Sequence, residues 1–244
     1  MALRIPFLLA TFWLCSITEM SSQKKDDFLF GFQLRPIIPN GYLKADQLQA
    51  SSEDLTYTAY IQPSLSFGAI IRKPIGPFWN LETGINLVRR NYRLNFSLTD
   101  SITVSSNQNM SFIGYEIPIQ GLIYVQLGKK WFMNASAGLV IDLFPSEAES
   151  FSSEKIDSTY VDFSQITWRE SWFKLAAQTN LGFEYRTKDK GYYYLGASYH
   201  LPLGRIAASQ GKVNYPNHSQ TLWLDLPTGY FSIDLKYFLF DQKK

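Results

Sequence analysis

The sequence predicts an all-β protein, an eight-stranded antiparallel up-and-down transmembrane β-barrel. First, apolar and polar residues alternate with period two along most of the chain beyond residue 22, as in strands with one apolar face. Second, the connections between the alternating stretches are short and long in turn, which is the layout of outer-membrane barrels. Third, aromatic residues make up 16% of the chain and gather near the ends of the predicted strands, where a membrane–water interface favours them.

Composition excludes several other classes. The 244 residues hold 23 Lys and Arg against 21 Asp and Glu, a balance that argues against binding nucleic acid through bulk charge. A hydrophobic content of 45% excludes a disordered chain. Beyond the N-terminal segment we find neither helical spacing nor an apolar run of 18 residues, which argues against a helical membrane bundle.

Residues 1–22 have the pattern of a secretory signal peptide. Arg4 supplies the positive charge, residues 5–15 are apolar, and small residues follow, so we expect cleavage before Gln23. The single cysteine, Cys15, lies inside this segment, and residues 23–244 are predicted to form the barrel domain without disulfides. An exported domain of this kind suits a Gram-negative envelope protein.

The last strand shows the alternation most clearly. Phe231, Ile233 and Leu235 fall on one face, and Ser232 and Asp234 fall on the other. The same rule predicts eight strands at residues 28–37, 56–72, 78–96, 109–127, 130–144, 165–186, 191–203 and 220–240. Each is long enough to cross a bilayer at a tilt.

The connections set the expected orientation. Short turns are predicted at residues 74–77, 128–129 and 187–190, and long polar loops at 38–55, 97–108, 145–164 and 204–219. Short turns lie in the periplasm in such barrels, and the strand number is even, so we expect both termini in the periplasm. A soluble lipocalin-like barrel with the apolar face inside is the alternative.

Short motifs carry a family resemblance. The strand containing Tyr115-Glu116-Ile117-Pro118-Ile119 resembles the Glu-Ile-Pro strand of the PorT-like outer-membrane β-barrel family of Bacteroidota. Residues 84–87 resemble that family's third strand, and residues 230–240 are similar to its terminal strand, although four residues follow here. The resemblance implies an outer-membrane barrel. It implies no single activity, because only a few members belong to secretion and gliding machinery.

Charged residues gather on the polar face, which we expect to face the barrel interior. Strand parity places there Arg35, Arg72, Glu82, Arg90, Glu116, Asp142, Lys174, Glu184, Arg186, His200, Asp234 and Lys236. The interior of an eight-stranded barrel is just wide enough for side chains, and charges there must be paired. We therefore predict a structural network that plugs the lumen. A narrow ion or proton path is the alternative.

No catalytic, cofactor or metal site is predicted. His200 follows Ser198 by two residues, so both face the interior, away from acyl chains, and His218 stands beside Ser219 in a polar loop. Neither pair makes a lipid-facing hydrolase triad, so we expect no enzyme; a lipid-modifying barrel enzyme is the alternative.

Surface residues suggest binding. Arg89, Arg90 and Arg93 stand near the long-loop rim and are candidate contacts for lipopolysaccharide phosphates, or ordinary solvated charges. The long loops carry candidate hydrophobic anchors at Ile37, Ile38, Tyr42, Phe151, Tyr160 and Tyr215. We predict a structural, accessory or binding subunit of an envelope assembly that contacts outer-membrane lipid and an envelope protein, but not nucleic acid.

Overall fold

The computed structural model describes residues 28–39, 47–76, 79–100, 103–156, 159–188, 190–216, 218–226 and 228–239. The predicted signal peptide and Tyr42 lie outside these residues. The described part is all-β and antiparallel, as predicted. No helix in it is long and apolar enough to cross a membrane.

Eight strands form a closed ring. They are β1 (Leu29–Ile38), β3 (Leu55–Pro74), β4 (Trp79–Thr99), β5 (Thr103–Gln126), β6 (Trp131–Leu143), β9 (Phe173–Arg186), β10 (Tyr192–Pro202) and β13 (Tyr230–Phe238). Each pairs with the ring strands before and after it in the sequence, and β1 pairs with both β13 and β3, which closes the ring. The ring therefore has the predicted up-and-down order.

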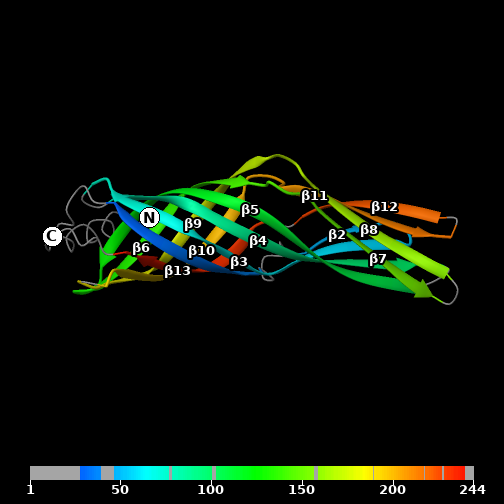
Figure 1. Cartoon of the computed structure of the whole chain (residues 1–244), viewed down its shortest axis with the longest axis horizontal. Coiled ribbons are helices and arrows are strands. Elements are labelled where there is room, and N and C mark those ends of the chain that lie inside the picture. Colours follow the sequence, from blue (N-terminus) through cyan, green and yellow to red (C-terminus); the bar gives the residue numbers. More distant parts are fainter. Residues whose placement is uncertain are drawn as a thin grey trace, which may run out of the picture.

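A second sheet projects from one end of this ring (Figure 1). It contains β7 (Ala148–Ile156), β8 (Thr159–Arg169), β11 (Ala207–Tyr215) and β12 (His218–Asp225), in the order β12-β11-β8-β7. The short strand β2 (Gln47–Ser51) pairs with the start of β3. We call this part, together with the ends of β3, β4 and β5 beside it, the projecting domain. All four segments predicted as polar loops thus contain strand residues, which corrects the sequence prediction. Segment 97–108 holds the end of β4 and the start of β5, and the other three hold β2, β7 with the start of β8, and β11 with the start of β12.

Two predicted strands are broken where the chain passes between ring and projection. The stretch predicted at 165–186 forms β8 and β9, separated at Glu170–Trp172, and the stretch predicted at 220–240 forms β12 and β13. At the first break the backbone N–H of Glu170 donates to the carbonyl of Ile206, so the chain leaves one sheet and enters the other. Alternation alone does not reveal such a change of sheet, because both halves keep period two.

Strands β3, β4 and β5 run through both parts. They contain 20, 21 and 24 residues, and at ~3.3 Å per residue they exceed the length needed to span a bilayer. Their far ends face the second sheet, with β5 beside β7, and β12 beside β2 and β3.

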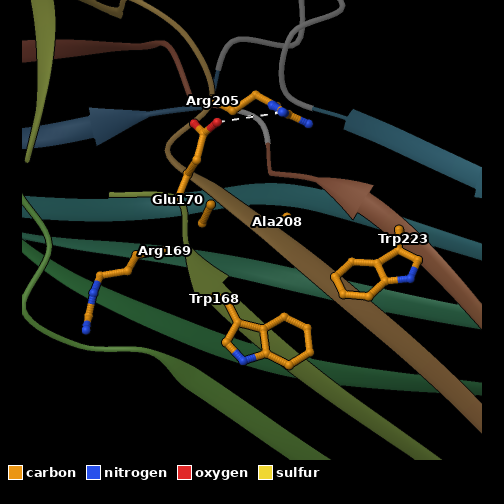
Figure 2. A pocket seen from close by; sticks show the side chains of 7 residues that line it. Trp168, Arg169, Glu170, Arg205, Ala208 and Trp223 are labelled. Carbon is orange, nitrogen blue, oxygen red and sulfur yellow. Dashed lines mark ion pairs between the residues drawn. The ribbon is translucent and has the colours of Figure 1, made fainter. Parts of the chain in front are cut away.

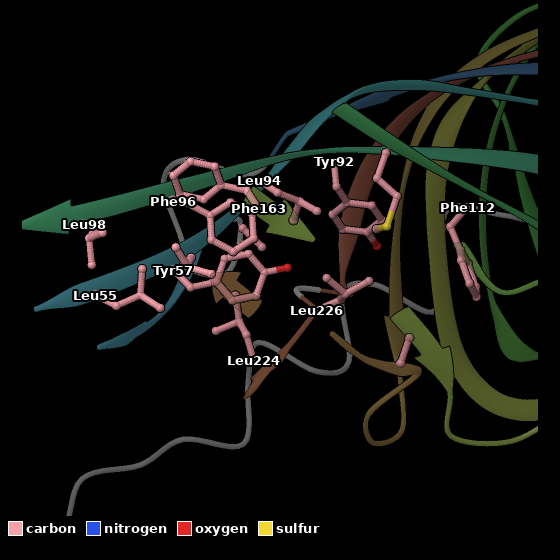
Figure 3. Packing of buried hydrophobic residues seen from close by; sticks show 14 of the residues in the cluster. Leu55, Tyr57, Tyr92, Leu94, Phe96, Leu98, Phe112, Phe163, Leu224 and Leu226 are labelled. Atoms are coloured by element: carbon pink, nitrogen blue, oxygen red, sulfur yellow. The ribbon is translucent and has the colours of Figure 1, made fainter. Parts of the chain in front are cut away.

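The projecting domain has its own hydrophobic core (Figure 3). Stacked rings of Tyr57 and Phe96, with centroids 4.5 Å apart, lie at its centre, and Phe163 packs against Phe96. Aliphatic residues from both sheets surround them, among them Leu55, Leu94, Leu98, Val161, Val213 and Leu224. Tyr57 and Tyr92 are also buried in this core, so these two aromatic residues do not lie at a membrane–water interface.

The outside of the ring is apolar and bears aromatic residues near its two ends. Large exposed hydrophobic side chains cover it, among them Phe32, Phe67, Ile85, Ile119, Leu139, Leu181, Leu195 and Leu235. At the end with the short turns, Trp131 contacts Tyr185 and Tyr193 contacts Tyr237. Trp172 is exposed beside the projecting domain. This distribution is the one expected of a surface that meets lipid.

Candidate functional site

Charged side chains inside the ring, all buried except the partly exposed Arg186, form two clusters. The first lies toward the short turns, and we call it the turn-side cluster: Arg72, Glu82, Glu184, Arg186 and Lys236. The guanidinium of Arg72 donates to Glu82, with Nη2 2.7 Å from Oε2, and also to Glu184. Lys236 donates to the other oxygen of Glu82, and Arg186 Nε lies 2.7 Å from Glu184 Oε1.

Strand register places these groups together. Arg72 and Glu82 are directly opposed on β3 and β4, whereas Glu184 reaches Arg72 from β9 across the interior. The Arg72 guanidinium also lies over the Phe238 ring, 3.9 Å from its centroid. The Arg72 guanidinium donates hydrogen bonds to carboxylates and also packs on an aromatic ring, so residues from several strands hold it in place.

The second cluster lies farther toward the projecting domain, and we call it the middle cluster: Arg35, Arg90, Glu116, Asp142, His200, Tyr230 and Asp234. Glu116 is its centre and accepts from Arg35 at 3.0 Å, from Arg90 at 3.1 Å and from the Tyr230 hydroxyl at 2.5 Å. Its donors come from β1, β4 and β13, so one carboxylate joins three strands to β5.

Asp142 and Asp234 extend the middle cluster on two sides. Asp142 Oδ2 lies 3.0 Å from Nε2 of His200 and 3.5 Å from Arg90. Asp234 lies 3.5 Å from Arg35 Nε and accepts from Ser198. All these charged side chains are buried.

The two clusters compensate each other in charge. Leaving His200 out of the count, the middle cluster has three carboxylates and two guanidiniums, and the turn-side cluster has three cations and two carboxylates. The net charges are therefore equal and opposite. Burying ions costs several kcal/mol each unless they are paired, so the balance favours a structural role for the network.

The middle cluster contains one group of metal-ligand residues. Oxygens of Glu116 and Asp142 and a ring nitrogen of His200 lie within 4.8 Å of one another. However, Arg90 contacts both carboxylates, and Arg35 contacts Glu116. A divalent cation would meet two guanidiniums there, so we assign no metal to this group.

Eleven of the twelve charged residues predicted to face inward lie in the two clusters. Lys174 lies apart: its Nζ is 2.7 Å from Glu170 Oε2 at the edge of the ring, where both are partly exposed. Sequence reasoning missed the inward tyrosines Tyr194 and Tyr230. The same parity rule finds them, because Tyr194 shares the face of His200, and Tyr230 that of Asp234.

The candidate contacts for lipopolysaccharide separate into two groups. Arg89 and Arg93 are exposed on the outside of β4, and Arg89 donates to Ser111. Arg90 is only 5% exposed and belongs to the middle cluster, so its prediction as a lipid contact is wrong. Neighbouring residues of a strand point to opposite faces, which is the physical reason.

Some of the predicted hydrophobic anchors are exposed, and others are buried. Phe151 and Tyr160 are 67% and 61% exposed on β7 and β8. Ile38 is exposed at the end of β1, whereas Ile37 and Tyr215 are buried, so the prediction of these two as surface anchors is wrong. Tyr215 lies in the core of the projecting domain.

The outer face of the projecting sheet contains a hollow of about 330 Å³ (Figure 2). Trp168 and Trp223 line it with stacked rings, whose centroids are 5.3 Å apart. Arg205 lies beside them and pairs with Glu170 at 3.6 Å and with Asp225 at 3.4 Å.

The eight strands form a closed antiparallel ring whose outside is apolar and whose interior is charged, and aromatic residues lie near both ends. These features define a β-barrel that spans an outer membrane. Comparison with known families agrees: the model of the family described as "Outer membrane protein beta-barrel domain" matches residues 28–207. The chain belongs to this family and is a protein of the bacterial outer membrane.

The chain is also similar to several solved structures. OprG from Pseudomonas aeruginosa is 13% identical, with 88% of this chain and 96% of that chain covered and a TM-score of 0.49. The protease OmpT from Escherichia coli is 7% identical, with coverage of 88% and 94% and a TM-score of 0.34. The translocator domain of the autotransporter NalP from Neisseria meningitidis is 12% identical, with coverage of 87% of both chains and a TM-score of 0.29. None of the curated proteins compared with the chain matches it.

Proposed function

We propose that this protein is a non-porin binding subunit of the outer membrane, which holds the projecting domain at the cell surface for a protein partner. In this proposal the side chains of the two clusters plug the lumen, and both termini lie in the periplasm. Phe151 and Tyr160 anchor the partner on the outer face of the projecting sheet.

The continuity between the middle cluster and the core of the projecting domain carries this proposal. The Arg90 guanidinium lies 5.6 Å from the centroid of the Phe144 ring, and Phe144 packs against Phe112 with centroids 5.5 Å apart. Both rings belong to the core of the projecting domain. The buried ion pairs of the middle cluster are therefore in direct contact with the close-packed apolar side chains of the projecting domain. This contact supports a closed lumen and a rigid surface domain.

Two further features fit a binding role. Loops and exposed surfaces on a rigid scaffold commonly carry recognition, and exposed aromatic residues are frequent binding anchors. The described chain ends lie at the short-turn end, because Leu29 pairs with Arg72 near the end of β3, and Phe238 pairs with the first residue of β10. This supports an outward projecting domain, since short turns face the periplasm in this class of barrel.

An enzymatic role is a weaker proposal. His200 and Ser198 are both buried, and the Ser198 hydroxyl donates to Asp234 while the imidazole contacts Asp142. A serine hydrolase needs its nucleophile bonded to the histidine and open to substrate. We therefore propose that the protein is not a hydrolase.

Kinship with the PorT-like family is part of the proposal. Glu116, in the motif that carries the resemblance, is the centre of the middle cluster. The role of Glu116 in stabilising the ring thereby accounts for the motif. Whether the protein is linked to secretion machinery depends on which partner it binds.

Capture of the partner tests the proposed function. Affinity purification from crosslinked native membranes is compared between wild type and the Phe151→Ser/Tyr160→Ser variant. Ile75→Ser is the matched control, because Ile75 is equally exposed but lies at the turn end. We expect one protein to co-purify with wild type and the control but not with the double variant. Equal recovery with all three, or none with any, would contradict the proposal.

A further inference from the structure

The hollow at Trp168 and Trp223 combines flat aromatic faces with one mixed group of charges. The two rings are stacked with an interplanar angle of 26°, and Trp223 is 56% exposed. Ala208 pairs with Trp168 on one side and Asp225 on the other, so a small side chain lies on the strand between the two indole-bearing strands. The indoles thus border an open surface rather than a filled one (Figure 2).

Charges at the edge of the hollow point to a ligand with both donors and acceptors. Arg205 offers only donors, whereas Glu170 and Asp225 offer only acceptors, and their pairings with Arg205 are long and solvent-exposed. An anion would be repelled by the two carboxylates, and a cation would have to displace Arg205 from both of them. A purely apolar ligand would remove water from all three groups and give them no hydrogen bond in its place.

We propose that this hollow binds a neutral saccharide. The C–H face of a sugar ring would stack on the indoles, whose faces carry partial negative charge. Its hydroxyls would accept from Arg205 and donate to Glu170 and Asp225. This site goes beyond the proposed protein contact, which uses Phe151 on β7 and Tyr160 at the opposite end of β8 from Trp168.

The size of the site fits a short saccharide. A second hollow of about 340 Å³ shares Arg205, Ala208 and Trp223 with the first and continues toward Gln49 and Ala50 on β2. Each volume lies at the lower end of the range for small-molecule sites. Together they suit two or three sugar units along one groove.

The site lies just above the rim of the ring. Arg169, which lines the first hollow, has its guanidinium 3.9 Å from the centroid of the exposed Trp172 ring. Surface glycolipid chains and free oligosaccharides can both reach that height, and they share the same chemistry.

Calorimetric titration of the full-length protein in detergent tests the site, with maltotriose, cellotriose and mannotriose as probes. Lipopolysaccharide with and without its O-chain, presented in nanodiscs, distinguishes the two sources. Variants are Trp223→Ala, its aromatic rescue Trp223→Phe, and Arg205→Gln. Phe151→Ala is the matched control, an exposed aromatic residue of the same sheet outside the groove.

We expect at least one triose, or O-chain-bearing lipopolysaccharide, to bind wild type and Phe151→Ala equally. Trp223→Ala should weaken binding about tenfold, and Trp223→Phe should restore most of it. Arg205→Gln should also weaken binding without changing the folded state. Binding of a triose assigns a free glycan, and binding of the O-chain alone assigns the glycolipid. No binding by either source, equal binding by Trp223→Ala, or binding only of the charged trisaccharide trigalacturonate would overturn the inference. Equal partner capture by wild type and Phe151→Ser/Tyr160→Ser would contradict the proposed function but leave the saccharide result unchanged, so the two proposals fail separately.

Discussion

Arg35 and Glu116 form an ion pair across the ring, with Nη1 of Arg35 3.0 Å from Oε2 of Glu116 and both side chains 1% exposed. The two residues are 81 positions apart and lie on β1 and β5, which are not neighbours in the sheet. The pair therefore forms only when the ring is closed. Contacts of this kind make the interior sensitive to single changes, because removing one partner leaves a buried charge.

Replacing Arg72 by methionine should destabilise the ring strongly. The change leaves Glu184 with Arg186 and Glu82 with Lys236, so we expect a loss of about 3 kcal/mol, the lower end for a broken buried pair. Urea unfolding in lipid vesicles measures the loss. Arg89→Met, an exposed arginine on the outside of β4, is the control and should change stability by less than about 0.5 kcal/mol. Equal effects of the two changes would refute the structural role of the network.

An added methyl group at Gly196 should disturb β9 and β10. A Cβ there would lie 2.6 Å from Cζ of Tyr194 and 2.7 Å from the carbonyl oxygen of Leu181. We expect Gly196→Ala to cost about 1–3 kcal/mol in the same unfolding assay, as overpacking usually does. Gly76→Ala is the control, because a Cβ at Gly76 meets nothing within 4 Å. If both variants unfold at the same urea concentration, Tyr194 does not pack over Gly196 as described.

The purified barrel should show no stable open conductance in planar bilayers. The proposal of a plugged lumen depends on the paired clusters and on the Phe112 and Phe144 rings, which pack against each other beside Arg90. A general porin inserted under the same conditions serves as the positive control. Large, persistent openings of the wild-type protein would instead favour the channel alternative.

Cysteine labelling should reveal the orientation in the membrane. The only native cysteine is Cys15, in the predicted signal peptide, so an introduced cysteine is labelled without a background. We expect Lys155→Cys, on β7, to react with a membrane-impermeant maleimide on intact cells. Lys129→Cys, in a short turn, should react only after the outer membrane is permeabilised. The reverse pattern would place the projecting domain in the periplasm and both termini at the cell surface.

High pH should destabilise the projecting domain. Burial raises the pKa of Tyr57 above its usual value, although the hydroxyl contact with Ser209 at 2.6 Å lowers it in part. Because the folded state keeps this proton longer than the unfolded state, its stabilising effect is complete below about pH 10. The effect is lost as the pH rises through the folded-state pKa. The difference in absorbance at 295 nm between wild type and Tyr57→Phe measures this ionisation. Titration of Tyr57 at the ordinary pH of an exposed tyrosine would show that the core is open to water.

Alternation in the sequence located the ring strands and the inward direction of Arg35, Glu82 and Glu116. It could do so because neighbouring residues of a strand point to opposite faces whatever the rest of the chain does. The projecting sheet was harder to find. Its inward positions include Gln165, Thr167 and Ser209, which are buried and joined by hydrogen bonds, so the apolar period is interrupted there.

The sequence by itself determined the all-β class, the short turns at one end of the ring and the inward direction of eleven of the twelve charged residues. Only the tertiary structure decided which charges meet, since Arg72 and Glu184 are 112 residues apart and Glu82 and Lys236 are 154 apart. It also decided that the long connections fold into a second sheet over a common core. Closure of the ring and packing of one sheet on another fix distances between remote segments, and no local pattern of residues contains those distances.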